Sequence, residues 1–421
     1  MDERSIPSAA IYAGSLAHTF EYRTTGIHAT PHLHWSFPLK EGATITCPIL
    51  VAEGVVYVGD SAGFLSALDA RRGDLLWCFA TDWALDEENA DLDLVESVTA
   101  FCLAGRLAYV ASNEQMLYEV DLSNGQKLRS WDEEALHISN EISLLLFYDQ
   151  LVWFNDWESI SCLDPATGSI APELFLCSYP IIYHHPRGSS DVIYGTILEE
   201  TNPPFGLYSV FLAINLSLFG SSCPLDLARE DISAEDATLW FTGEGDDQVE
   251  VCDEICEDLY TVMDETFYAV CNQVFFDDEG TATHTPPNGT RLPYELRALD
   301  PFTGAVQWRY TIPKGVSEGF IQLAAASHLI FLVLSKGVEA IDTHTHQRRW
   351  KWTSNDAHWH ILVADGLLFV LDEAGQITAL DVLTGEQRWH WQTEQPIKEQ
   401  FSTIADATLY LVMDHTLCAF R

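Results

Sequence analysis

The chain has 421 residues, 47% of them hydrophobic and 12% aromatic, so it can bury a large core and belongs to the globular rather than the disordered class. Its 21 basic and 63 acidic side chains give a formal net charge of −42, which argues against binding to nucleic acid or to an anionic membrane through a broad electrostatic surface. The ten cysteines are scattered and lie mostly in apolar runs, as is typical of reduced, buried thiols.

Residues 1–30 carry none of the repeat landmarks found later, and we expect them to form an N-terminal arm or an additional outer strand. The first seven residues contain neither a basic segment nor a long apolar one, and no later run approaches about 18 uncharged apolar residues. We therefore expect no secretion signal, no membrane anchor and a cytoplasmic location.

Residues 54–77 contain the unit from which the rest of the chain is built. The run 55–59 is apolar, β-branched and aromatic, and 64–69 alternates around small residues, which predicts two short strands of a packed sheet. Asp60 and Gly63 bound a hairpin turn between them, since Gly accepts the positive φ of such turns. One unit of this kind must stack against a neighbour to bury its second apolar face.

A second turn in the unit runs from Asp69 to Gly73 and leads into a strand that carries Trp77. The Asp carboxylate can accept local backbone N–H groups, and the Gly suits the left-handed region. The same landmarks recur along the chain. The turn Asp is found at Asp69, Asp121, Asp164, Asp300, Asp342 and Asp381; the Gly at Gly73, Gly125, Gly168, Gly304 and Gly385, with His346 in the remaining unit; and the Trp at Trp77, Trp131, Trp308, Trp350 and Trp389.

The spacing of about 40 to 45 residues between these short-strand units predicts the blades of a β-propeller. We expect the side chains that recur from unit to unit to pack neighbouring blades against one another. They are Trp35, Trp77, Trp131, Trp308, Trp350 and Trp389, with the turn residues Asp69, Asp300 and Asp381.

In chain order, the predicted blades span 43–80, 95–131, 140–176, 177–255, 257–312, 319–353 and 357–392, with an eighth made from 399–421 and 32–38. The strand 32–38 carries Trp35 but has no preceding strands of its own, and the last unit ends without its Trp strand. We expect the N-terminal strand to complete the C-terminal blade and close the ring, since this leaves no open sheet edge between the chain ends.

The blade count depends on the interval from Asp164 to Asp300, which holds either two enlarged repeats or three ordinary ones. Three would give nine blades, outside the usual range of four to eight, and two give eight. The acidic content of 220–258 favours insertion. We predict an all-β fold of eight four-stranded blades in one domain, 31–421, with insertions around 177–258 and 277–293.

With its Ala-Leu-Asp, Gly and Trp pattern, as in Ala298-Leu299-Asp300 to Trp308 and Ala379-Leu380-Asp381 to Trp389, the chain resembles the PQQ-like propeller repeats. These repeats occur in quinoprotein alcohol dehydrogenases and in the outer-membrane assembly lipoprotein BamB. The resemblance covers about 32–421, weakly in 177–255, and implies an eight-bladed propeller with Trp side chains docked between blades.

The resemblance does not imply the cofactor PQQ, because the repeat name describes a blade and function must be argued from a site. Quinoprotein enzymes of the family typically carry a signal peptide and a vicinal Cys pair, and BamB-like proteins an N-terminal lipidated Cys. None of these features is present in the sequence, where the first Cys is Cys47. We therefore expect no cofactor: the resemblance leaves PQQ and Ca²⁺ open, but the sequence shows no site that supports them.

The residues about ten positions before the second strand of each unit are expected to line the channel. They include Glu96, Glu141, Glu318, His358, His360 and Glu399. A ring of carboxylates with two imidazoles could bind a cation or a basic peptide tip. The simpler interpretation is that Glu residues stand on a solvated rim.

Pairs of potential metal ligands occur at His358 and His360 and at Cys252 and Cys256, but zinc needs about four converging ligands. The acidic runs 82–96 and 226–258 are interpreted as solvated loops or, second, as a patch that faces a partner. No catalytic motif is found in the sequence. The leading hypothesis is a cytoplasmic, non-enzymatic scaffold that binds a protein with a basic surface; the alternative is a quinoprotein-like enzyme, a PQQ or small-ligand binder, or a sensor domain.

Overall fold

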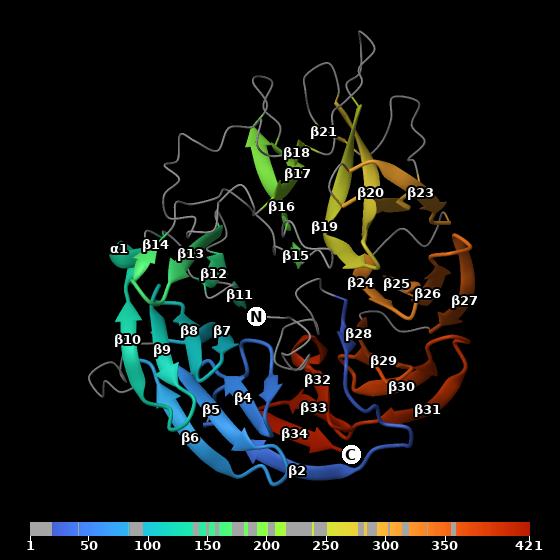
Figure 1. Ribbon diagram of the computed structural model, residues 1–421. Helices are drawn as coiled ribbons and strands as arrows, with labels where there is room; N and C mark the ends of the chain where they lie inside the picture. The colour runs from blue at the N-terminus through green and yellow to red at the C-terminus, as the bar shows by residue number, and fades with distance from the viewer. Residues whose placement is uncertain are drawn as a thin grey trace. The chain divides into compact units, whose positions relative to one another are not determined.

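The computed structural model shows that strands are the main regular structure of its described residues (Figure 1). The structure describes residues 19–40, 42–82, 84, 96–136, 138, 142, 144–148, 151–155, 160–170, 181–183, 192–200, 207–215, 238–239, 251–276, 282–283, 293–301, 304–313, 320–334, 336–354 and 359–421. Within these residues the α-helical structure is the single turn α1 (Glu133–Leu136). The all-β class predicted from the repeats is confirmed.

The described residues fall into two compact units. The first takes its residues from Phe20–Glu173 and His358–Arg421, and the second from Leu16–Thr19 and Leu174–Ala357. The described strands of the two units form eight sheets of four or five strands.

The first unit contains five sheets, whose strands pair antiparallel except for β1, described below, and which follow the predicted units. Three come from its N-terminal half: β3 (Leu50–Ala52), β4 (Val55–Gly59), β5 (Phe64–Asp69), β6 (Leu75–Ala80); β7 (Val98–Ala104), β8 (Leu107–Ser112), β9 (Leu117–Asp121), β10 (Lys127–Trp131); and β11 (Leu144–Tyr148), β12 (Leu151–Asn155), β13 (Ile160–Asp164), β14 (Ser169–Ile170). Two come from its C-terminal half: β28 (Trp359–Ala364), β29 (Leu367–Asp372), β30 (Gln376–Asp381), β31 (Gln387–Gln392); and β32 (Thr403–Ala405), β33 (Thr408–Met413), β34 (Thr416–Phe420) with β2 (Leu33–Pro38).

The second unit contains three sheets. They are β15 (Ile181–Tyr183), β16 (Val192–Glu200), β17 (Leu207–Asn215), β18 (Thr238–Leu239); β19 (Val251–Met263), β20 (Thr266–Phe276), β21 (Ala282–Thr283), β22 (Glu295–Leu299), β23 (Val306–Thr311); and β24 (Phe320–Ala326), β25 (Leu329–Leu334), β26 (Gly337–Asp342), β27 (Gln347–Thr353).

The strand β2 pairs antiparallel with β34 (Figure 1). One sheet therefore contains strands from both end regions of the chain, as predicted from the strand that carries Trp35 and has no preceding strands of its own. The register places Trp35 opposite Ala419 and Pro38 opposite Thr416. Backbone hydrogen bonds between His32 and Arg421, 2.7 and 3.0 Å long, extend the pairing by one position.

The additional outer strand expected within residues 1–30 lies on the other side of its sheet. Strand β1 (Glu21–Tyr22) pairs in parallel with β28, at the edge opposite to β31. Of the two alternatives for residues 1–30, an N-terminal arm or an additional outer strand, the described residues form a short strand that does not lie at the outer edge. The outer edge belongs to the Trp strand of each repeat, and β28 leaves its other edge available to the arm.

The predicted insertions also contain regular structure. The acidic segment 251–258, interpreted as loop, belongs to β19, which pairs with β20 from Val251↔Phe275 onward. Two residues of the predicted loop 277–293 form β21 against β20.

The turn that starts at each landmark Asp has the predicted chemistry. In the first sheet the Asp69 carboxylate accepts hydrogen bonds from Arg71 N at 3.0 Å and Arg72 N at 2.9 Å, and Gly73 N donates to Asp69 O at 2.8 Å. In the second unit His346 takes the Gly place with φ of 58°, as predicted. The strands enclosed by these turns are buried, for example Val56, Leu65 and Leu68 at 0% exposure.

Among the helices of the described residues, none combines the length and the apolar character needed to cross a membrane.

Candidate functional site

The Trp side chains of the first unit stand at contacts between successive sheets. The indole Nε1 of Trp35 donates to Ala70 O at 3.0 Å, and that of Trp77 donates to Leu122 O at 2.8 Å, so each bonds the turn of the sheet that follows. Each ring also packs on an aromatic ring of its own sheet, Tyr410 or Tyr57, with centroids 5.9 Å apart.

Trp389 shows the same geometry with a different acceptor. Its Nε1 donates to Ile27 O at 2.8 Å, and its ring lies 5.8 Å from Phe369. The next sheet consists of β32, β33, β34 and β2. No turn connects its third strand, β34, to its outer strand, β2. The chain that enters β2 therefore supplies the carbonyl group that a turn supplies elsewhere.

The second sheet of the first unit departs from this pattern because Trp131 is displaced by two residues. Arg129 occupies the pairing position of the Trp, opposite Glu119. The Glu119 carboxylate is 4% exposed and receives Arg129 Nη2 at 2.6 Å and the Tyr109 hydroxyl at 3.0 Å. The Arg129 guanidinium lies 5.2 Å from the Trp131 ring, so a cation–π contact joins the two positions.

In the second unit, Trp308 lies 5.8 Å from Tyr268 of its own sheet and stacks on the His346 ring at 4.7 Å and 16°. Trp350 packs 5.9 Å from Phe331. Asp300 closes its turn through Gly304 N at 2.9 Å. The third predicted docking Asp, Asp381 in the first unit, also accepts Arg388 Nη2 at 2.6 Å.

Glu96 is not a rim residue. It is 1% exposed, and the Tyr118 hydroxyl donates to its Oε1 at 3.0 Å. Burial, together with the neighbouring Glu96 charge, raises the pKa of Tyr118 and keeps this phenol a donor. The sequence placed Glu96 at the channel because it lies about ten positions before the second strand of its unit. That spacing gives no information about Tyr118, which lies on the third strand of the sheet and bonds Glu96.

His360 lies on β28, opposite Leu371, and its ring meets the Phe20 ring edge-on at 5.6 Å. Burial lowers the pKa of this imidazole to about 4, so it is neutral at physiological pH. A neutral imidazole packed against Phe20 does not add positive charge to the predicted circle of channel carboxylates.

Of the other predicted channel residues, Glu141, Glu318 and His358 lie outside the described residues, and Glu399 begins the short 3-10 turn η8 (Glu399–Phe401). The channel-rim site therefore stays a prediction.

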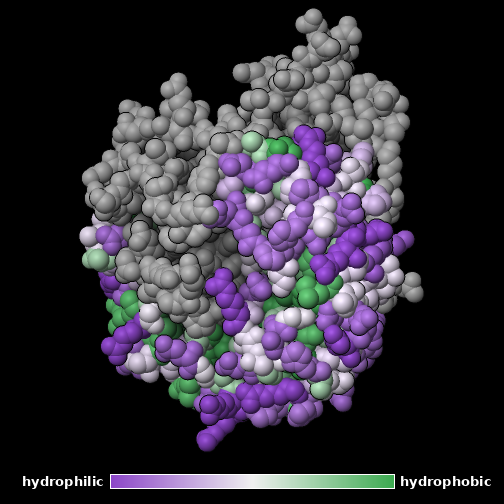
Figure 2. Space-filling model, turned by 45° about the vertical axis from the view of Figure 1, so that its right-hand side comes forward, coloured by the Kyte–Doolittle hydropathy of each residue, from purple (hydrophilic) through white to green (hydrophobic). Residues whose placement is uncertain are grey.

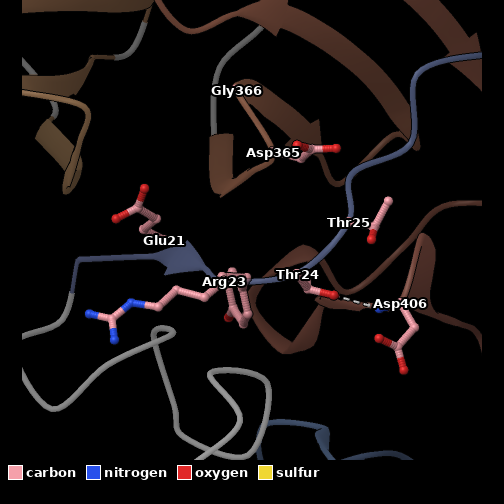
Figure 3. Close-up of a pocket in the computed structure, with 8 residues that line it drawn as sticks. Glu21, Arg23, Thr24, Thr25, Asp365, Gly366 and Asp406 are labelled. Atoms are coloured by element: carbon pink, nitrogen blue, oxygen red, sulfur yellow. Dashed lines mark hydrogen bonds between the residues drawn. The ribbon is translucent and has the colours of Figure 1, made fainter. Parts of the chain in front are cut away.

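A pocket of about 580 Å³ that the sequence did not indicate lies beside β1 in the first unit (Figure 3). Its walls come from the arm and from two turns: Glu21, Tyr22, Arg23, Thr24, Thr25, Asp365, Gly366 and Asp406. The Thr24 hydroxyl accepts Asp406 N at 2.6 Å, and Ala407 N donates to Thr25 O at 2.9 Å, so the arm is fastened to the turn between β32 and β33.

The other turn of the pocket, between β28 and β29, holds Asp365. Its Oδ2 lies 2.8 Å from His28 Nε2 and accepts Gly26 N at 3.3 Å. The His28 ring, followed by the Gly26 N–H, lowers the pKa of this carboxyl, which therefore stays ionised. Burial raises the pKa of Tyr22 to about 12, so the phenol beside it stays neutral. The pocket is polar and contains more carboxylates than basic groups.

A buried carboxylate in the second unit bonds two basic side chains of an outer strand. Glu339 is 0% exposed, and its Oε1 receives Lys351 Nζ at 2.9 Å and Arg348 Nη1 at 3.2 Å. The Tyr310 hydroxyl donates to the Oε2 atom at 3.2 Å. Such a buried charge is tolerated because it is fully paired.

The family described as outer membrane protein assembly factor BamB matches residues 46–172 and 294–420, more than half of the chain. The chain belongs to this PQQ-like propeller family. No curated protein sequence matches significantly.

Solved structures with the same fold support the propeller assignment. The quinohemoprotein alcohol dehydrogenase from Comamonas testosteroni is 12% identical, with a TM-score of 0.60, covering 98% of this chain and 80% of that one. The quinohemoprotein alcohol dehydrogenase ADHIIG from Pseudomonas putida HK5 is 12% identical, with a TM-score of 0.59 and coverage of 99% and 80%. The computationally designed protein Ika8 is 12% identical, with a TM-score of 0.56 and coverage of 94% and 99%. At these identities the likeness is one of fold.

The described residues contain no group of three or more His, Cys, Asp or Glu side chains that could hold a metal ion. The sequence also has no two adjacent cysteines.

Proposed function

We propose that this propeller is a non-enzymatic scaffold in the cytoplasm that binds a protein partner with a basic surface. It acts as a ring of eight blades, one per sheet, closed where β2 joins β34. The binding surfaces are its acidic loops and patches.

The observation that carries the proposal is how the few basic side chains are used. On the outer strands they point back to carboxylates of the same sheet: Arg129 to Glu119, Arg309 to Glu295, Arg349 to Asp342 and Arg388 to Asp381. These pairs neutralise positive charge locally, in a chain with a net charge of −42. The unpaired excess is therefore negative, and a negative field steers basic partners toward the surface.

A salt-resolved pull-down from the native host tests the proposal. The immobilised chain should retain a basic protein at low ionic strength and release it as NaCl rises, since exposed charge pairs are screened within about 10 Å at 0.1 M salt. The double variant Glu21→Gln, Asp406→Asn tests whether the arm pocket takes part. If no partner elutes in a salt-dependent way, the acidic-interface proposal is rejected.

A second candidate, binding of PQQ or another small ligand, is favoured by the fold likeness to the quinohemoprotein alcohol dehydrogenases. It predicts a rise in melting temperature with PQQ and Ca²⁺, because a ligand of the native state stabilises it by mass action. No rise at saturating ligand would remove this candidate.

A further inference from the structure

The outer strand β6 differs from the other outer strands of the described sheets. Those of at least five residues, apart from β6, each carry a basic residue or a histidine: β2 (LHWSFP), β10 (KLRSW), β23 (VQWRYT), β27 (QRRWKWT) and β31 (QRWHWQ). The sequence of β6 is LLWCFA, without charge, histidine or proline. Charged side chains and proline are devices that keep an open sheet edge from pairing with another chain.

The apolar side chains of β6 are exposed. Leu75 is 51% and Leu76 52% exposed, and Cys78 is also exposed. Within the described part of the chain, β6 has a strand neighbour on one side, β5, and is the last strand of its sheet (Figure 1). A bulge at Leu76 recurs at the same place in other sheets, so it does not compensate for the missing charge.

The ends of β6 carry opposite charges. Arg71 and Arg72 lie exposed in the turn before the strand. After the strand comes Asp82, whose side chain is 48% exposed and bonds Lys127. An antiparallel partner strand with the same sequence brings the basic end of one copy next to the Asp82 end of the other.

We propose that β6 pairs antiparallel with β6 of a second copy of this chain, about a two-fold axis through Trp77. In this register the exposed Leu76 faces the exposed Cys78 of the other copy, so apolar side chains meet and no like charges are opposed. The same pairing through β27 would set arginines against one another. Self-complementarity is the property that an isologous contact requires.

The salt dependence of this contact is opposite to that of the proposed partner. Two chains of charge −42 repel each other, so the dimer is weak at low salt and strengthens as the Debye length falls from about 10 Å at 0.1 M to about 3 Å at 1 M. A basic partner would dissociate over the same range. The two proposals can therefore fail separately.

Sedimentation velocity of the full chain at about 0.1 M and about 1 M NaCl tests the dimer. We expect a concentration-dependent dimer at high salt, and at least a tenfold weaker association in Leu76→Lys, because a lysine of one copy then enters an apolar pair. Leu383→Lys is the matched control: Leu383 is 48% exposed but lies outside β6, and its change should leave the dimer intact. A monomer at both salt concentrations, or an unchanged dimer in Leu76→Lys, overturns the proposal.

Chemical crosslinking gives a second readout. Of the free cysteines recorded in the described residues, Cys78 is exposed and the rest are buried. A short bismaleimide should join two Cys78 thiols at high salt, and the product should disappear in Cys78→Ser. Crosslinking that persists in Cys78→Ser counts against the register.

Discussion

Carboxylates of the first unit experience two opposite environments. Asp60 is 3% exposed, and burial raises the pKa of its carboxyl although the backbone N–H groups of Phe64 and Ala62 bond it. Asp121 is partly exposed, and its bonds with Ser123 lower the pKa of its carboxyl. Ionised Asp60 therefore destabilises the folded state, whereas ionised Asp121 stabilises it.

For Asp60→Asn we expect a gain in unfolding free energy at pH 7. The amide oxygen can still accept from Ala62 N and Phe64 N, which lie 2.9 and 3.1 Å from Oδ1, but it carries no charge. Because the native pKa is above the unfolded one, wild-type stability is fully present below the ordinary Asp value of about 3.9 and is lost as pH rises. Urea titrations at pH 7 and pH 3.5 should show the gain at the first pH only.

Asp121→Asn is the matched control with the opposite sign. Its native pKa is lowered, so the wild type keeps this stabilisation at neutral pH and loses it in acid. The variant should be less stable than wild type at pH 7, with a smaller difference in acid. The same direction of change in both variants would contradict the assignment.

His360 predicts a loss of stability in mild acid. The unfolded chain protonates this imidazole near pH 6.5, whereas the folded chain does so near pH 4. Stability therefore falls as pH drops from about 6.5 to about 4, by at most about 3 kcal/mol. In His360→Asn the fall measured by urea unfolding should be smaller. An unchanged pH profile would show that folding does not lower the pKa of His360.

At the scale of the element, the contact between a Trp strand and the next turn depends on glycine. Gly125 has φ of 73°, and a Cβ there would lie 2.5 Å from Cε3 of Trp77. Gly54 has a similar φ of 78° but no atom within 4 Å of the added Cβ. The pair separates backbone strain from sheet docking.

Gly54→Ala should cost about 1–2 kcal/mol, the strain of a left-handed alanine. Gly125→Ala should cost this amount and about 1–3 kcal/mol more, because the methyl group displaces the Trp77 ring. Equilibrium unfolding measures both, and Trp fluorescence should change in Gly125→Ala. Equal costs would mean that the Trp77 ring moves without penalty.

What the sequence predicted follows the range of the interactions. The turn Asp, its Gly and the Trp act within about eight residues of one another, so a repeat shows them directly. The pairing of β1 with β28 joins Glu21 to Val363, and Glu96 is buried by Tyr118 from another strand. Neither partner can be found from local spacing, and the arm pocket, which depends on Thr24, Asp365 and Asp406, was missed for the same reason.

Acidic composition likewise misled the interpretation of 251–258. A charged segment with no apolar alternation resembles a loop until its partner is known, and β20 is that partner, with Cys252 opposite Val274. The pattern within one strand predicts which of its side chains share a face. It does not predict which other strand will pair with it.

At the scale of the molecule, the described residues on the face shown in Figure 2 are mostly hydrophilic, with apolar patches between them. The net charge of −42 is far from neutrality, and self-repulsion of this size favours solubility but works against the compact state. The basic residues of the outer strands offset part of it through short pairs such as Arg388–Asp381.

Added NaCl should therefore raise the melting temperature of this chain, in contrast to a protein held by surface ion pairs. Screening weakens the repulsion among all exposed carboxylates, whereas the pairs with buried Glu119 and Glu339 are screened much less. Scanning calorimetry between about 0.01 and 1 M NaCl should show most of the rise at low salt, where the Debye length changes from about 30 to 10 Å. The Leu76→Lys variant should show the same rise, because repulsion within one copy does not depend on the β6 contact. A rise confined to chains that dimerise would instead attribute the effect to association, and a falling melting temperature would mean that attractive surface pairs outweigh the repulsion.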